Sequence, residues 1–188
     1  MALLAEEIVE EWLNRQGYFT IRGIKLGVHE IDLLAVKSRG QGEVECRHIE
    51  VQASIHPVSY ITPLPKQHRK EGRPSHSAKE RLQSELAEGV SEWIEKKFWH
   101  AKKLELMKSL WGGPWSSELV LGEVKWETEV DLIRENGIDV LRLRDIIREL
   151  GEKDFPVPSA SGADFIDLIH MTSRTLQAAR TRAVGAGR

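Results

Sequence analysis

The stretches HEIDLLAV, at residues 29–36, and RHIEVQA, at residues 47–53, decide the fold of this chain. Both are short and rich in aliphatic residues, and the glycines of SRGQG (38–42) between them favour a turn. If the hairpin is centred on Gln41, the numbers of antiparallel partners add up to 82, and Asp32 lies opposite Glu50.

Side chains alternate between the two faces of a strand, so each face of this hairpin has its own chemistry. One face is apolar and is expected against the core: Ile31, Leu33, Ala35, Ile49, Val51 and Ala53. The other face is mainly polar and acidic: Glu30, Asp32, His48, Glu50 and Gln52. An ordinary exposed polar face is the alternative interpretation of this second set.

Periodicities around the hairpin predict an α/β fold in which helices flank a mixed sheet. Helices are expected at 3–16, between Ser77 and Gly112 (one long helix or two joined near Trp99), and at 127–136, 144–150 and 163–180. Further strands are expected at 18–24, 118–126 and 138–143. The last two strands, joined by a short helix, should be parallel. The pattern Ser77 to Glu80 predicts a capping box at the start of the long helix.

Composition divides the chain into one domain, a loop and a tail. Residues 1–152 are expected to form the domain, interrupted at 56–76 by a mobile loop with four prolines and several basic residues. Residues 153–188 are expected to be a linker and a C-terminal helix that packs on the domain or on a second copy, which would give a homodimer.

Several classes of protein are excluded by composition. The longest apolar runs are about four residues, against about 20 for a membrane span. A single cysteine, Cys46, rules out a disulfide framework and a cysteine-based zinc site. The opening MALLAEEIVEEW has no basic stretch and is not expected to be a signal peptide, so the cytoplasm is the expected compartment.

Two carboxylates facing each other across a hairpin repel by about 0.2–1 kcal/mol. A cation between them would relieve this repulsion, and carboxylate oxygens favour a hard ion such as Mg²⁺ or Mn²⁺. Such an ion can polarise a phosphodiester and generate hydroxide near neutral pH. Asp32 and Glu50 are therefore the candidate metal ligands.

The segments EIDLLAV (30–36) and IEVQ (49–52) resemble the PD-(D/E)xK nuclease superfamily, of restriction-endonuclease-like fold. The order helix, three strands, helix, strand, helix, strand also resembles this family, and AEEIVEEWLNRQGY (5–18) is similar to its Holliday-junction-resolvase-like branch. The resemblance covers about residues 5–150. It implies a DNA nuclease in which Asp32, Glu50 and the Val51 carbonyl hold the metal. It also implies a role for Glu7 in binding a second metal or its hydration shell; the adjacent Glu6 is the alternative.

Gln52 stands where the family has its lysine. A glutamine can position a water but cannot supply positive charge. Lys125, on a later strand, is a candidate accessory donor of charge.

Residues 61–108 have a net charge of +4 and are the expected surface for an anionic partner. Within the loop, the residues expected to contact DNA phosphates are Lys66, Arg69, Lys70 and Arg73. By contrast, Trp93, Trp99, Trp111 and Trp115 are expected in the core or an interface rather than as base-stacking platforms.

The sequence therefore predicts a metal-dependent nuclease that hydrolyses phosphodiester bonds of DNA. The rival hypothesis is a catalytically degraded module of the same fold, which binds nucleic acid or a protein partner without cleavage. Gln52 favours the rival.

Overall fold

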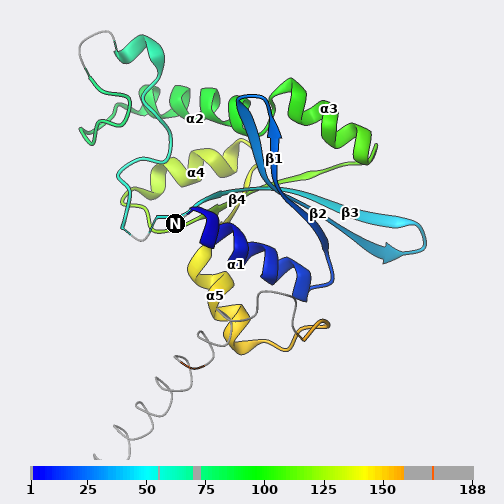
Figure 1. Ribbon diagram of the computed structural model, residues 1–188. Coiled ribbons are helices and arrows are strands. Elements are labelled where there is room, and N and C mark those ends of the chain that lie inside the picture. Colours follow the sequence, from blue (N-terminus) through cyan, green and yellow to red (C-terminus); the bar gives the residue numbers. More distant parts are fainter. Residues whose placement is uncertain (1, 55, 70–72, 159–170, 172–188) are drawn as a thin grey trace, which may run out of the picture.

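A five-stranded mixed sheet forms the centre of the protein (Figure 1). The computed structural model describes residues 2–54, 56–69, 73–158 and 171. The strands lie in chain order: β1 (Phe19–Leu26), β2 (His29–Gly40), β3 (Glu43–Gln52), β4 (Ser116–Leu121) and β5 (Asp139–Arg142). The pairs β1–β2 and β2–β3 are antiparallel, and β3–β4 and β4–β5 are parallel.

Helices cover both faces of this sheet (Figure 1). Helices α1 (Ala2–Arg15) and α5 (Leu143–Glu152) pack on one face. Helices α2 (Gln83–Lys97) and α4 (Glu127–Glu135) pack on the other face, over β4. Helix α3 (Ala101–Leu110) packs through Met107 against Ile31 and Leu34 of β2, and the short 3₁₀ helix η1 (Lys66–Arg69) lies in the β3–α2 connection. The expected α/β architecture is confirmed.

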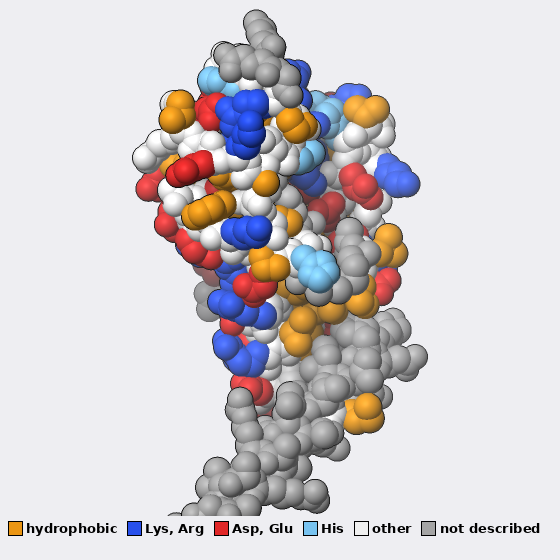
Figure 2. Space-filling model, turned by 90° about the vertical axis from the view of Figure 1, so that its left-hand side faces the viewer, with side chains coloured by type: hydrophobic (Ala, Val, Ile, Leu, Met, Phe, Trp, Pro, Cys, Tyr) orange, Lys and Arg blue, Asp and Glu red, His pale blue; other side chains and the backbone are white. Residues whose placement is uncertain are grey.

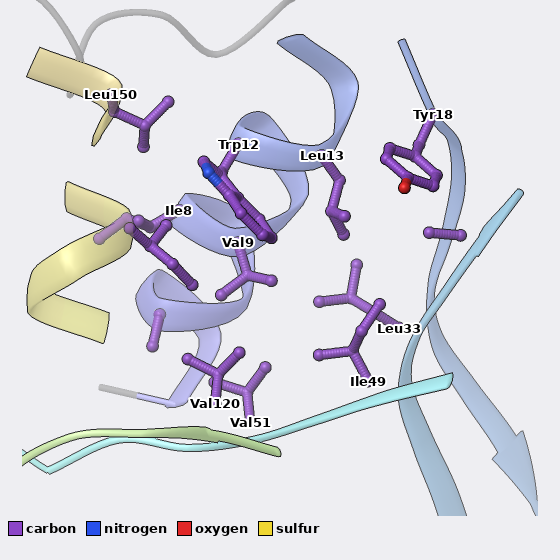
Figure 3. Packing of buried hydrophobic residues seen from close by; sticks show 13 residues of the cluster. Ile8, Val9, Trp12, Leu13, Tyr18, Leu33, Ile49, Val51, Val120 and Leu150 are labelled. Carbon is purple, nitrogen blue, oxygen red and sulfur yellow. The ribbon is translucent and has the colours of Figure 1, made fainter. Parts of the chain in front are cut away.

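The largest core cluster joins α1 and α5 to the sheet (Figure 3). Val9 and Leu13 of α1 point toward the strands, where they meet Leu33, Val51 and Val120. Helix α1 is thereby anchored on the apolar face of the hairpin, and of its glutamates Glu6 is near enough to Glu30 and Glu50 to interact with their charges.

The hairpin has the register expected from the sequence. Leu33 pairs with Ile49, and the same register continues to Ser38 opposite Val44, with an irregularity before Gly40. Gln41, at the turn, has a positive φ of 52°. The parallel β4–β5 pair is also confirmed, as is the end of α4 at Gly137, whose φ is 79°.

Three expectations about local structure are wrong. Helix α2 begins at Gln83 rather than near Ser77, because the Glu85 carboxylate accepts the Leu82 N–H. The break into two helices at Trp99, by contrast, is one of the two expected arrangements. The fourth strand ends at Leu121, well before residue 126. Ile31 leaves the cluster of Leu33 and joins the one under α3.

Much of the expected tail lies outside the described residues, including the helix expected at 163–180, apart from Met171. No helix among the residues that the structure describes is long and apolar enough to cross a membrane.

We expect Gly122→Ala to destabilise the fold by about 1–3 kcal/mol, measured by urea denaturation. A Cβ atom at Gly122 would lie 2.6 Å from the Ser54 carbonyl oxygen and 2.9 Å from its nitrogen, where the chain leaves β3 beside β4. Gly112→Ala is the control, because a Cβ atom there meets nothing within 4 Å. Equal stability of the two variants would contradict the close packing at this point.

Candidate functional site

Asp32 and Glu50 meet where the β2–β3 ladder ends. The last main-chain pair is Leu33 with Ile49, and beyond it the Val51 N–H donates to the Asp32 carboxylate at 2.7 Å. Asp32 is only 8% exposed and Glu50 only 1%. The polar face of the hairpin is thus buried at this end, which rules out the interpretation as an ordinary exposed face.

Three cationic or hydrogen-bonding side chains hold the Glu50 carboxylate. Lys97 Nζ, at the end of α2, lies 2.9 Å from Oε2, and Lys103 Nζ, in α3, lies 2.5 Å from Oε1. His48 Nε2 lies 2.9 Å from Oε1. Burial alone would raise the pKa of Glu50, but His48, Lys97 and Lys103 together lower it to about 2. Glu50 is therefore ionised throughout the physiological range.

Asp32 has the opposite electrostatic balance. Burial raises the pKa of Asp32 to about 7, and the Glu50 charge contributes to the rise. The Lys97 ammonium and the Val51 N–H oppose the rise without cancelling it. At neutral pH this carboxyl group is poised between its two protonation states, because burial and the Glu50 charge outweigh the Lys97 ammonium and the Val51 N–H.

Lys97 is the functional residue that the sequence analysis missed. Burial lowers the pKa of Lys97, but the charges of Glu50 and Asp32 raise it by more. The net pKa is therefore raised, and the ammonium stays charged beside the two carboxylates. The sequence did contain a signal: Lys97 falls at a core-facing position of the apolar repeat that includes Leu86, Val90 and Trp93. A lysine in such a stripe needs a buried partner.

Glu6, rather than Glu7, is the helix α1 glutamate at this site. Burial raises the pKa of Glu6, and Glu30 and Glu50 add to the effect. Glu7 instead lies 3.5 Å from Arg22 on β1, a longer ion pair at the side of the helix. Glu6, the alternative to Glu7 in the sequence analysis, is therefore the glutamate whose charge acts on Asp32 and Glu50.

The remaining motif residues have other contacts. The Gln52 amide donates to the Ile61 carbonyl at 2.9 Å and so ties the segment after β3 to the sheet, which leaves its expected role of positioning a water unsupported. The Val51 N–H serves Asp32, while the Val51 side chain joins the core. Lys125 is exposed, and its N–H donates to the Val58 carbonyl; no contact brings it to the carboxylates.

Two of the four residues expected to contact phosphates have partners within the protein. Arg69 donates to the Leu64 carbonyl at 2.6 Å, and Arg73 pairs with Glu85 at 2.6 Å. Lys66 is exposed, and Lys70 lies outside the described residues. On the face drawn in Figure 2, basic and acidic side chains are interspersed rather than segregated.

The donor atoms suit a hard cation in type but not in number. Asp32 and Glu50 offer carboxylate oxygens, and burial together with the Glu50 charge raises the pKa of Asp32, an effect that a bound cation would oppose. No cluster of three or more metal-ligating side chains is present in the described part of the chain. Asp32 and Glu50 would therefore have to be completed by main-chain oxygens, water or substrate.

Comparisons with known proteins give little guidance. No family model and no curated protein matches the chain. A solved protein of unknown function, AF1548, is similar with a TM-score of 0.40 and 13% sequence identity, over 75% of this chain. The matched region spans 57% of that protein.

We expect Asp32→Asn to be more stable than the wild type, by a margin that grows with pH. A raised native pKa means that the native state holds a proton that the unfolded state releases, so wild-type stability falls as pH rises from about 4 through 7. The margin should widen by about 2–3 kcal/mol between pH 5 and pH 8 in chemical denaturation. Asp131→Asn, at an exposed ion pair with Arg134, should show no such widening.

We expect Lys103→Met to cost about 3 kcal/mol or more, because it removes a cation from a buried carboxylate. Lys102→Met changes an exposed neighbour in the same helix and should stay within about 0.5 kcal/mol. In the double variant with Glu50→Gln, the loss should be clearly smaller than the sum of the single losses. Additive losses would show that the pair is not coupled.

Proposed function

We propose that this protein is a metal-dependent nuclease that hydrolyses phosphodiester bonds of DNA. The observation that supports this is the buried pair of Asp32 and Glu50 with the Lys97 ammonium beside it. Two carboxylates and a lysine are the combination of charges that the PD-(D/E)xK resemblance implies. Here the lysine would come from helix α2 instead of from position 52.

Each residue then has a role that follows from its contacts. Asp32 and Glu50 would hold Mg²⁺ or Mn²⁺, which when bound acidifies water and polarises the phosphoryl oxygen. Lys97 would stabilise negative charge that develops on the phosphate. Lys103 and His48 orient Glu50, and the Val51 N–H orients Asp32. Gln52 holds the following segment in place rather than acting on the water.

The raised pKa of Asp32 gives metal binding a pH dependence. Only the ionised carboxylate is a ligand, so a cation must displace the proton that Asp32 holds below about pH 7. Metal affinity should therefore increase from pH 6 to pH 8, and binding at pH 6 should release a proton.

The proposed compartment is a reducing cytoplasm, which suits the buried free thiol of Cys46.

The second candidate function is a module that binds DNA without cleaving it. The contacts of Glu50 favour this second function, because two ammonium groups and an imidazole already bind its carboxylate. Such a network needs no metal for its charge balance. Metal binding therefore distinguishes the two functions before any activity is measured.

We expect single-stranded, duplex or branched DNA to be cleaved with Mg²⁺ or Mn²⁺, and Asp32→Ala to abolish the cleavage. Lys97→Met should lower the rate by about 100-fold or more, as expected for removal of a group that stabilises transition-state charge. Lys79→Met, at an exposed lysine before α2, should leave the rate unchanged. Cleavage that survives Asp32→Ala would contradict the assignment.

Calorimetry of Mn²⁺ binding supplies a readout that does not depend on activity. At pH 6, in buffers of different ionisation enthalpy, the wild type should release close to one proton per ion, and Asp32→Asn should bind weakly and release none. If no cleavage and no Mn²⁺ binding are found, the non-catalytic module is the better description.

A further inference from the structure

A cavity of about 540 Å³ lies at the break between α2 and α3. Its lining includes two lysines, two glutamates, an aromatic ring and an imidazole: Lys66, Lys96, Glu92, Glu95, Trp99 and His100. Trp99 is 45% exposed, although a residue of this type is usually covered. Of the two expected placements, core or interface, Trp99 is therefore not in the core, whereas Trp93, six residues earlier, is buried.

The helix break explains why this ring faces outward. Phe98 is the C-cap of α2 and is fully buried, in the cluster that α2 forms with β4. His100 adopts an extended conformation as the N-cap of α3. The chain turns between these two anchored residues, and Trp99 is the residue left on the outside of the turn.

Two histidine rings and several lysines lie beside the glutamates on this side of the break. The His29 ring, at the start of β2, stacks on His100 with 3.7 Å between ring centroids. Partial burial lowers the pKa of His29, and His100, Lys103, Lys102 and Lys96 lower it further. Of these lysines, Lys96 and Lys102 are exposed, whereas Lys103 is buried against Glu50, and α3 has no acidic residue in its first turn.

The cavity region and the carboxylate site share the elements α2, α3 and β2. Lys96 precedes Lys97, which binds Glu50, and Lys103 of α3 binds the same carboxylate. His29 comes three residues before Asp32 on β2.

The cavity and its surroundings suit different parts of a nucleotide. Glu92 and Glu95 would repel a phosphate inside the cavity, but their oxygens can accept hydrogen bonds from the amino groups of a base. The exposed ring of Trp99 offers a stacking surface, and Lys96 and Lys102 can contact the flanking phosphates. A base can reach such a ring only when it is out of a duplex.

We propose that this cavity binds an unpaired nucleotide of a single-stranded nucleic acid, with its base stacked on Trp99 and its phosphates near Lys96 and Lys102. The inference rests on the proposed function in that it takes the partner to be nucleic acid. It goes further by naming single-stranded segments, and hence strand ends, flaps or loops, as the preferred substrate class.

The test is binding of a fluorescent 20-nucleotide single strand and of the matching duplex, measured by anisotropy in EDTA so that no chemistry occurs. The wild type should prefer the single strand. Trp99→Ala should weaken single-strand binding by about 10-fold or more and leave duplex binding nearly unchanged. Trp126→Ala is the matched control, because Trp126 is 49% exposed but lies at the start of α4.

Lysine variants test the phosphate contacts separately. Lys96→Gln combined with Lys102→Gln should reduce the steepness of the salt dependence by about one to two counterions, whereas Lys79→Gln should not. Equal loss from Trp99→Ala and Trp126→Ala, or equal loss of single-strand and duplex binding on Trp99→Ala, would overturn the inference. Circular dichroism of each variant establishes that the fold is intact.

The outcomes separate this inference from the proposed function. Trp99-dependent single-strand binding without metal-dependent cleavage would support the cavity and refute the nuclease. Cleavage that depends on Asp32 but is indifferent to Trp99 would support the nuclease and refute the cavity.

Discussion

The buried carboxylate of Glu50 constrains the rest of the site. An ionised group at this depth is tolerated only when it is paired and hydrogen-bonded, and it has Lys97, Lys103 and His48 as partners. The two lysines come from different helices, one from the end of α2 and one from the start of α3. On a single straight helix, side chains six residues apart point to different sides, so both ammonium groups could not reach one carboxylate. The ion pairs of Glu50 therefore depend on the helix break at Trp99.

Asp32 is the counterpart of this arrangement. Burial raises the pKa of Asp32 to about 7, the nearby Glu50 charge adds to the rise, and the Lys97 ammonium only partly opposes it. The native fold is thereby less stable at neutral pH than it would be with a neutral residue at this position. Such a cost is typical of a position where a ligand is meant to supply the missing charge, because functional sites are where strain of this kind is retained.

The same break gives the protein its exposed aromatic ring. Phe98 must enter the core and His100 must begin α3 beside His29, so Trp99 has only the outside available. The carboxylate site and the cavity therefore depend on one local event in the chain. A substitution that joined α2 and α3 into one helix would be expected to disturb both.

The sequence carried enough information for the sheet and its register. Alternation in 29–36 and 47–53 is a local property, and the glycines around Gln41 fix the turn, so the opposition of Asp32 and Glu50 could be deduced without further knowledge. The start of α2 could not be deduced, because the sequence offers two possible starts close together. One is the expected capping box of Ser77 and Glu80, and the other is the contact that forms, between the Glu85 carboxylate and the Leu82 N–H. The contacts of Arg69 with the Leu64 carbonyl and of Arg73 with Glu85 could not be deduced either, because they depend on how the loop folds back on α2, and the phosphate contacts expected for this loop stay a prediction.

By itself, the sequence determined the order of elements, the hairpin and the two carboxylates, all of which follow from short-range periodicity. Only the tertiary structure decided which cations meet those carboxylates, which of Glu6 and Glu7 faces them, and where Trp99 lies. Lys97 and Lys103 are 47 and 53 residues from Glu50 along the chain. Contacts at that separation depend on how helices pack on the sheet, and no local pattern of residues encodes that packing.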